Sequence, residues 1–338
     1  MHFLITGHTG FKGTWLTLLL HQRGHQVSGL SLEPEPDSLY IRAGVSNFLE
    51  NDIRCDIRNA ALTEKHFKSI NPDVVIHLAA QSLVRESYKN PVTTIETNLL
   101  GTINVLKASQ VVERLQAQLI VTTDKVYKNT GKSEGYIESD PLGGLDPYSA
   151  SKAMADIATQ SWLASYSNAP TAIARAGNVI GGGDFSADRL VPDLIRSFST
   201  HQIPKLRAPN SVRPWQHVLD CLSGYLILVD KILTNEIIGA WNFGPDETQF
   251  RTVASVAEYA CEIWNPQVSW VLDNNNHPHE ATLLTLNSNK ARFQLGWQEK
   301  LDFEQSIRWS IEWYKRVNEG ESAIENCLRN INEFELMN

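Results

Sequence analysis

The sequence predicts an α/β protein built on a doubly wound parallel sheet, and three observations point to this fold class. Short apolar segments alternate with helical ones over the first part of the chain. The apolar segments are continuous, as expected of parallel strands that helices cover on both faces. A glycine-rich stretch follows the first apolar segment and opens the first helix. The connections between strands should therefore be right-handed crossovers.

The first strand is expected at His2–Thr6, and the first helix at Thr14–Arg23, where Gly24 ends it. The second strand, Gln26–Leu32, stops before the two prolines of residues 33–38. The remaining strands are expected at Asp73–Leu78, Leu119–Thr123, Thr171–Arg175 and, from a shorter apolar pattern, Asn47–Asp52. The remaining helices are expected at Leu62–Ile70, Thr94–Gln110, Tyr148–Ser165 and Phe303–Val317.

The glycine-rich stretch reads G-H-T-G-F-K-G and has the spacing G-x-x-G-x-x-G. Glycine permits a tight turn and lets backbone N–H groups approach a pyrophosphate at the N-terminus of a helix. Because the stretch lies between a strand and a helix, it predicts a Rossmann-type dinucleotide site. The cofactor-binding residues expected here are Gly7, Thr9, Gly10, Phe11, Lys12 and Gly13.

The length of 338 residues suggests two domains, or one domain with an added lobe. After residue 176 the alternation weakens, and Gly-, Pro- and Trp-rich segments appear. Residues 1–176, with a return near 218–247, are expected to form the dinucleotide-binding domain. Residues 177–217 and 248–338 are expected to form a smaller α/β substrate-binding lobe.

Charge and cysteine content argue against several classes of function. The net charge is −8 and no Lys/Arg cluster is present, so nucleic acid is not an expected partner. The four cysteines are scattered without a zinc-binding spacing, which indicates reduced thiols in the cytoplasm. The first strand begins too early to leave room for a signal peptide, and no apolar stretch approaches the ~20 residues of a membrane helix.

The end of the second strand leaves the choice between NAD and NADP open. A carboxylate here would bind the adenosine ribose hydroxyls of NAD, but Ser31 stands in that place and Glu33 lies two residues further on. Asp56 and Ile57, in the stretch C-D-I-R, are candidates to hold the adenine. NAD is the expected cofactor, with NADP as the alternative.

The helix at Tyr148–Ser165 opens with Y-S-A-S-K, which places Tyr148 and Lys152 on one helical face. A nearby ammonium favours the phenolate, so the pKa of Tyr148 is expected to be lowered. Tyr148 could then take a proton from a sugar hydroxyl as a hydride leaves for nicotinamide. Lys152 would also hold the nicotinamide ribose.

A second polar segment, T-T-D-K-V-Y, follows the strand expected at Leu119–Thr123. Ligands of a doubly wound sheet bind at the carboxyl ends of its strands. Thr123, Asp124 and Lys125 should therefore face the site, where a carboxyl and an amine with perturbed pKa values could serve as acid and base.

Together these segments resemble the CDP-glucose 4,6-dehydratases, a family within the extended short-chain dehydrogenase/reductases. The similarity runs from the first strand to about Tyr314. It is carried by G-H-T-G-F-K-G, H-L-A-A-Q, T-D-K, D-P-L-G-G-L-D-P-Y-S, G-N-V-I-G-G-G-D and R-P-W-Q-H-V. One departure concerns Lys125, because most dTDP-glucose relatives have a glutamate there.

The resemblance implies an internal redox reaction whose product is a CDP-4-keto-6-deoxy sugar. Tyr148 would deprotonate the glucose 4-hydroxyl while NAD takes the C4 hydride, water would leave across C5 and C6, and the hydride would return to C6. Thr123 would polarise the 4-oxygen, and Asp124 would protonate the departing C6 hydroxyl. Lys125 would either remove the C5 proton, if burial lowers its pKa, or stabilise the enolate-like charge.

The resemblance also implies binding residues and an assembly. Leu78, Ala79, Ala80 and Thr97 would line the cofactor, and Arg213 would grip the substrate diphosphate, a bidentate contact that suits a guanidinium. The other residues expected on the substrate side are Gln81, Arg85, Asn178 and Arg189, while His217 and His279 are divided between a structural and a substrate-binding role. Relatives are homodimers or homotetramers through the helices near 94–110 and 148–165.

Three alternatives stay open. The first is the same dehydration of another nucleotide-linked hexose. The second is 4-epimerisation, which needs only the tyrosine, the lysine and the cofactor, so that the Asp124–Lys125 pair argues against it. The third is a cofactor-sensing binding protein on the same fold, which would typically lack Tyr148 or Lys152.

Overall fold

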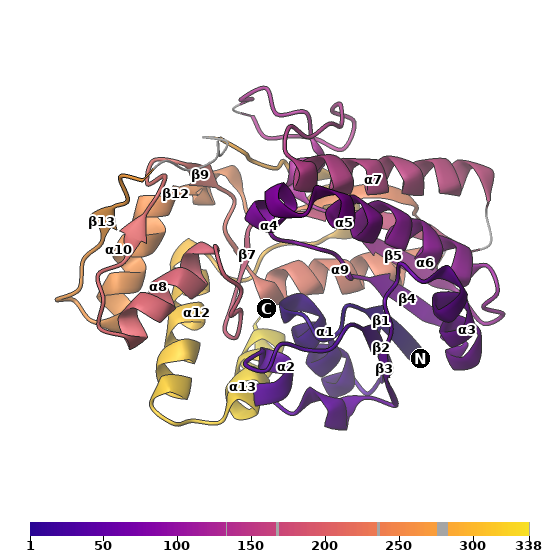
Figure 1. Cartoon of the computed structure of the whole chain (residues 1–338), viewed down its shortest axis with the longest axis horizontal. Coiled ribbons are helices and arrows are strands. Elements are labelled where there is room, and N and C mark those ends of the chain that lie inside the picture. Colours follow the sequence, from indigo (N-terminus) through magenta and orange to yellow (C-terminus); the bar gives the residue numbers. More distant parts are fainter. Residues whose placement is uncertain (133, 167–168, 235–236, 276–282, 338) are drawn as a thin grey trace.

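A single seven-stranded sheet forms the centre of the protein in a computed structural model that describes residues 1–132, 134–166, 169–234, 237–275 and 283–337 (Figure 1). All neighbouring strands are parallel, in the order β11-β6-β5-β4-β1-β2-β3. The strands are β1 His2–Thr6, β2 Gln26–Ser31, β3 Asn51–Arg54, β4 Val74–His77, β5 Ala117–Val121, β6 Thr171–Ala176 and β11 Gly239–Phe243. The order reverses between β1 and β4, which is where a doubly wound sheet binds its ligand. The predicted fold class is confirmed.

Helices cover both faces of this sheet (Figure 1). On one face lie α3 (Ala60–Ile70), α6 (Gly101–Ser109) and α7 (Pro147–Ser165), and α6 contacts both of the others. On the other face lie α1 (Phe11–Gln22) and α9 (Val218–Leu233). Each face has its own apolar core, and strand side chains alternate between the two cores: Leu4 belongs to one, and Phe3 and Ile5 belong to the other.

A separate group of helices lies at one end of the molecule and consists of α8 (Leu190–Ser199), α10 (Val253–Trp264) and α12 (Phe303–Asn318) (Figure 1). Three short strand pairs accompany it: β7 Val179–Ile180 with β10 Gln216–His217, β9 Val212–Arg213 with β12 Arg251–Thr252, and β8 Lys205–Leu206 with β13 Val271–Leu272. The last helix, α13 (Ala323–Leu336), returns to pack against α1 and α2 (Leu39–Arg42). None of the helices described is both long and apolar enough to cross a bilayer.

The remaining elements are short. They are α4 Val84–Lys89, α5 Pro91–Ile95, a π-helical turn η2 Glu96–Leu100 that joins α5 to α6, α11 Asn289–Leu295, and the 3₁₀ turns η1 Val45–Phe48, η3 Asp124–Val126 and η4 Glu247–Gln249.

Two predicted strands differ from the structure. The strand expected at Asn47–Asp52 is wrong, because η1 occupies its first part and β3 begins only at Asn51. The strand expected to end at Thr123 ends at Val121. Its last residue leaves the sheet because the Thr123 side chain accepts a hydrogen bond from the Lys125 backbone N–H and caps η3.

A buried ionic network joins the sheet to the segment after residue 283. The guanidinium of Arg175 in β6 donates to both carboxylate oxygens of Asp156 in α7, each at 2.8 Å, and to the Tyr127 hydroxyl at 2.9 Å. That hydroxyl donates to Asn242 Oδ1 in β11 at 2.7 Å. The Asn242 amide in turn donates to the carbonyl of Asn287 at 3.1 Å. The network therefore ties α7, β6 and β11 to the segments that contain Tyr127 and Asn287.

Candidate active site

The carboxyl ends of the strands open into a cavity of about 1000 Å³. Its walls come from the turn after β1, the segments after β4, β5 and β6, and the start of α8. The predicted cofactor-side residues on its wall are Gly7, Thr9, Gly10, Phe11, Lys12, Gly13, Asp56, Ile57, Leu78, Ala79, Ala80, Thr97, Tyr148 and Lys152. The predicted reaction- and substrate-side residues on its wall are Thr123, Lys125, Gln81, Arg85, Asn178, Arg189 and Arg213.

The glycine turn packs so closely that larger residues could not replace its outer glycines. A Cβ on Gly7 would lie 2.6 Å from the backbone nitrogen of Ala79, and Gly7 has a φ of 79°. A Cβ on Gly13 would lie 2.2 Å from the carbonyl oxygen of Gly7. The turn therefore lies against the end of β4, and α1 begins at Phe11 on the cavity wall. The free N–H groups of its first turn suit a diphosphate.

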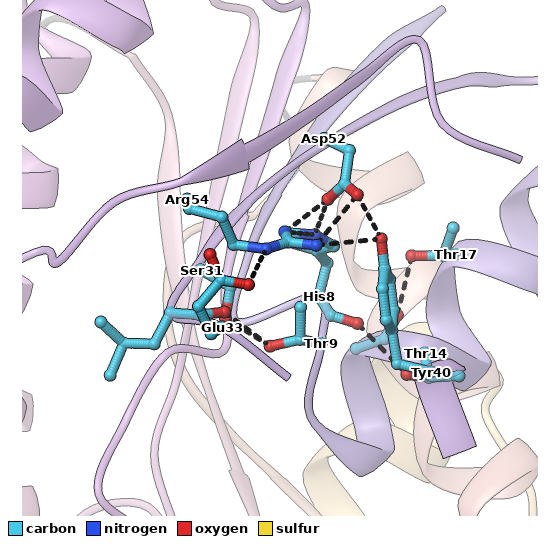
Figure 2. Close-up of polar contacts among 11 residues, drawn as sticks. His8, Thr9, Thr14, Thr17, Ser31, Glu33, Tyr40, Asp52 and Arg54 are labelled. Atoms are coloured by element: carbon cyan, nitrogen blue, oxygen red, sulfur yellow. Dashed lines mark hydrogen bonds and ion pairs between the residues drawn. The ribbon is translucent and has the colours of Figure 1, made fainter. Parts of the chain in front are cut away.

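At the end of β2, hydroxyl groups line the cavity and charged side chains lie behind them. Ser31 and Thr9 line the cavity and share a hydrogen bond of 2.7 Å between their hydroxyls. Figure 2 shows the Arg54 guanidinium between the carboxylates of Asp52 and Glu33, with the Glu33 contact at 3.2 Å. Glu33 is absent from the cavity wall among the described residues.

The two described arginines that follow this edge of the sheet, Arg54 and Arg58, both contact acidic side chains, and Arg54 contacts Asp52 and Glu33. Arg58, which lines the cavity, donates to Asp56 Oδ2 at 2.6 and 2.9 Å and to Asp56 Oδ1 at 3.1 Å. A ribose 2′-phosphate requires cationic donors that are not already neutralised. The site therefore fits NAD better than NADP.

Tyr148 and Lys152 lie on the same face of α7, but the expected lowering of the tyrosine pKa is wrong. Burial raises the pKa of Tyr148 to about 12, although the Thr123 hydroxyl, which faces the phenol, lowers it in part. The Lys152 ammonium donates to the carbonyl of Val121 at 2.8 Å, so it stabilises the end of β5 instead of a phenolate. Burial, with the charge of Lys12 adding to it, lowers the pKa of Lys152 to about 8.

The segment Thr123–Lys125 brings a hydroxyl, a carboxylate and an ammonium to the end of β5. Thr123 donates to Asp124 Oδ1 at 2.8 Å, and Lys125 Nζ lies 3.4 Å from the same oxygen. Thr123 and Lys125 line the cavity, whereas the Asp124 side chain is fully buried behind them. Asp124 Oδ2 has no hydrogen-bond partner within the described part of the chain. The expectation that Asp124 faces the site is corrected, because burial places its side chain off the cavity wall.

Polar groups from the opposite wall face the same space. The Asn178 side chain carries an Oδ1 that no described residue contacts by a hydrogen bond. Arg189 is held in place by Asp184 at 2.8 Å and by the Ser82 hydroxyl at 2.9 Å. Arg213 has only 7% of its surface exposed and donates to the carbonyl of Val212 at 2.9 Å. Fixed guanidiniums of this kind suit a diphosphate.

Residues 3–244 match the model of the NAD dependent epimerase/dehydratase family. The chain belongs to this family. The family match extends from Phe3 in β1 to just beyond β11, so it covers the sheet apart from His2 and most of the cavity wall, leaving out Val253, Leu283 and Leu284.

Curated relatives of this epimerase/dehydratase include sugar-nucleotide dehydratases. The CDP-glucose 4,6-dehydratase of Salmonella typhimurium strain LT2 is 38% identical over 341 residues, which cover 98% of this chain and 95% of the relative. The dTDP-glucose 4,6-dehydratase of Haemophilus influenzae is 25% identical, covering 93% of this chain and 98% of the relative. The structure of the dTDP-glucose 4,6-dehydratase of Bacillus anthracis with NAD has a TM-score of 0.79 and 22% identity, covering 97% and 99% of the two chains, and shows the shared fold.

The family assignment settles the choice between NAD and NADP, which the residues at the end of the second strand left open. NAD is the cofactor of this epimerase/dehydratase, in agreement with the neutralised arginines beside β2. The residues that hold it, and those that react, are assigned below as proposals.

Of the two histidines divided between a structural and a substrate-binding role, His217 has the structural one. Its ring is fully buried, it is not on the described cavity wall, and its Nδ1 accepts from the Leu219 N–H at the start of α9. Burial lowers its pKa to about 3, as expected of a neutral capping ring. His279 lies outside the described residues.

Sequence reasoning missed an ion bridge at the mouth of the cavity. Asp188 accepts from Arg207 at 3.1 Å and lies 3.3 Å from Arg85, which connects the segment after β4 with the lobe. All three residues line the cavity. Asp188 also has a φ of 62°, in the left-handed region that non-glycine residues rarely adopt. No motif marks Asp188 or Arg207, because their partners come from distant parts of the sequence.

Proposed function

We propose that this protein is an NAD-dependent 4,6-dehydratase that converts CDP-glucose to CDP-4-keto-6-deoxyglucose. One observation carries the proposal: Lys125 and Tyr148 line one cavity that also fits a dinucleotide, and Asp124 lies directly behind Lys125, 3.4 Å from its Nζ. A 4-epimerase needs no such pair. The identity of the nucleotide is supported by the 38% match to a CDP-glucose 4,6-dehydratase, against 25% for a dTDP-glucose enzyme.

The first half of the reaction is assigned to Tyr148. Its phenol takes the proton of the glucose 4-hydroxyl, and the Thr123 hydroxyl beside it polarises the 4-oxygen. NAD, when bound, supplies the acceptor and later the donor of the hydride that the sugar gives up at C4 and regains at C6. Its proposed binding residues are the glycine turn, Asp56, Ile57, Leu78–Ala80, Thr97 and Lys152.

The second half is assigned to the pair after β5. Once C4 is a ketone, the C5 proton is acidic and water can leave from C6. Asp124 gives a proton to the departing hydroxyl, through the carboxyl oxygen that has no partner among the described side chains. Lys125, which is 28% exposed in its side chain and contacts Asp124, either takes the C5 proton or stabilises the charge that develops at C4.

Substrate binding is assigned to the lobe and the start of α8. Arg213 and Arg189 hold the diphosphate, and Asn178 Oδ1 accepts from a sugar hydroxyl. In this proposal residues 177–217 and 248–338 serve as the substrate lobe. Two exposed apolar side chains, Leu100 on η2 and Ile157 on α7, support assembly as a homodimer or homotetramer through these helices. The proposed location is the cytoplasm.

The proposal is tested by incubating the purified protein with CDP-, dTDP-, UDP- and GDP-linked hexoses without added reductant. CDP-glucose is expected to lose one water, seen by mass, and to give a product that absorbs in alkali. Water loss from a different nucleotide sugar would keep the mechanism and replace the substrate. Inversion at C4 without water loss would replace the dehydratase by a 4-epimerase.

Replacing Lys125 by methionine tests its role as the C5 base. If Lys125 removes that proton, solvent deuterium should enter C5 about a hundredfold more slowly in Lys125→Met. Lys125→Glu is the matched control, because it restores a group that can accept a proton and should recover part of the exchange. Both variants should keep the fold, since this side chain is partly exposed. An unchanged C5 exchange rate in Lys125→Met would exclude Lys125 from both roles, because the charge at C4 develops as the C5 proton leaves.

A further inference from the structure

The backbone of Tyr148 is held by a hydroxyl from another helix. Tyr148 is the second residue of α7, and the N–H groups in the first turn of a helix have no partner within the helix. Pro147 carries no N–H, and the N-cap residue Asp146 accepts from the N–H of Ser149 at 2.9 Å. The Tyr148 N–H instead donates to the Ser87 hydroxyl in α4 at 3.1 Å. The first turn of α7 is therefore fixed to α4 at the residue to which the role of base is assigned.

The Ser87 hydroxyl is itself fixed in direction. It donates to the carbonyl of Val84 at 2.6 Å, which leaves its lone pairs to the Tyr148 N–H. The Ser87 side chain is fully buried and is not on the described cavity wall, so any effect on the reaction has to pass through Tyr148. On the same short helix, Val84, Arg85 and Tyr88 line the cavity. The helix α4 therefore presents side chains to the cavity and, through Ser87, also holds the base.

A second set of contacts joins the segment after β4 to the same turn of α7. The Asn98 amide in η2 donates to the carbonyl of Gln81 at 2.9 Å and to the Ser151 hydroxyl at 2.8 Å. Ser151 in turn donates to the Tyr148 carbonyl at 2.7 Å. Asn98 and Ser151 are both fully buried. The N–H and the C=O of Tyr148 are therefore both tied to residues 81–98, which also form part of the cavity wall.

We infer that Ser87 is a positioning residue for Tyr148 and holds the phenol where it can reach a sugar hydroxyl in the cavity. The inference rests on the proposed role of Tyr148 as general base. One turn further along α7, Lys152 is anchored independently by the carbonyl of Val121 at 2.8 Å. Loss of the Ser87 contact should therefore shift the first turn of α7 more than the second. A catalytic group displaced by about 1 Å can lose about a hundredfold in rate.

Ser87→Ala removes the acceptor of the Tyr148 N–H and no group of the cavity wall. Turnover of CDP-glucose is expected to fall about tenfold to a hundredfold, while KM changes little because the substrate-side wall is preserved. The deuterium isotope effect with substrate labelled at C4 should rise, since the proton and hydride transfers become slower relative to the other steps.

Ser310→Ala is the matched control. Ser310 is also fully buried, its hydroxyl also donates to a helix carbonyl, that of Ser306 at 2.7 Å in α12, and it is not on the described cavity wall. Turnover in this variant should stay at the wild-type value. Thermal unfolding of both variants checks that they are folded.

A double variant distinguishes positioning of the base from a general loss of structure. In Tyr148→Phe the base is already absent, so adding Ser87→Ala should lower the residual turnover no further. A further loss as large as that of Ser87→Ala alone would overturn the inference, and so would wild-type turnover in Ser87→Ala. Ser87→Cys retains a weak acceptor of similar size and should lose less turnover than Ser87→Ala. The cysteine variant also carries the test if the alanine variant does not fold.

Hydrogen exchange of the peptide that opens α7 tests the same contact without any substrate. Its amides should exchange faster in Ser87→Ala than in wild type or Ser310→Ala, and an unchanged rate would overturn the inference whatever the activity. The kinetic measurements use whichever nucleotide sugar the wild type oxidises at C4, since a dehydratase and a 4-epimerase both begin with that step. A turnover loss with a sugar other than CDP-glucose would support the role of Ser87 and correct only the proposed substrate. No oxidation of any of these sugars by wild type would overturn the proposed function, and this role of Ser87 with it.

Discussion

Tyr148→Phe is expected to lower the turnover of CDP-glucose by about a hundredfold to ten-thousandfold, the range for removal of a general base. Only the hydroxyl is lost, and the ring of phenylalanine fills the same space, in which the tyrosine is only 8% exposed. NAD and substrate affinity should therefore change little. Both constants, and the rate of product formation, can be measured on the same preparation.

The pH dependence of this variant provides a sharper test. In the cofactor-free enzyme burial holds the pKa of Tyr148 at about 12, so the phenol is protonated at neutral pH. Because the base must be deprotonated, wild-type turnover should rise with pH, and the residual turnover of Tyr148→Phe should not share this rise. Tyr166→Phe, at the exposed end of the same helix, is the control. Wild-type turnover in Tyr148→Phe would remove Tyr148 from the reaction.

Asp124→Asn is expected to lower the rate of water loss to about a hundredth of the wild-type rate, while C4 oxidation continues. Asparagine preserves the volume of this fully buried side chain and the acceptor for Thr123, but it carries no acidic proton. Oxidation without dehydration should appear as the absorbance of reduced nicotinamide when CDP-glucose is added. Full turnover in Asp124→Asn would exclude Asp124 as the acid.

A substrate analogue separates the acid role from a structural one. CDP-6-deoxy-6-fluoroglucose has a leaving group that depends less on protonation than a hydroxyl does. It should lose fluoride at similar rates in wild type and Asp124→Asn if Asp124 acts only as the acid. An equal loss of rate with both substrates would instead indicate that Asp124 positions Thr123 or Lys125.

The fold could be predicted because its signals are local. Continuous apolar strands and the Gly7–Gly13 turn are both contained in short segments, and the structure reproduces β1 as predicted. The first helix was predicted less well, because α1 begins at Phe11 and not at Thr14. The ends of strands were harder to predict, because the hydrogen bond by which Thr123 caps η3 competes with pairing in the sheet. The helix α13 was missed, although Cys327, Ile331 and Phe334 recur at helical spacing and are buried.

The site could be predicted as a set of residues but not as a set of interactions. Motif positions identified most of the cavity wall, because strand ends converge in a doubly wound sheet. The raised pKa of Tyr148 depends on burial and on where Lys152 points, which spacing along a helix does not determine. The bridge from Asp188 to Arg85 depends on two loops that meet only in the folded protein.

The Arg175 network and the Asp188 bridge lie on different sides of the same cavity and differ greatly in strength. Separating Arg175 from Asp156 would strand a buried charge, at a cost of about 3–5 kcal/mol. The Arg85–Asp188 contact is partly exposed, and such pairs contribute about 0–1 kcal/mol. The Arg85–Asp188 contact should therefore break far more readily than the Arg175–Asp156 pair.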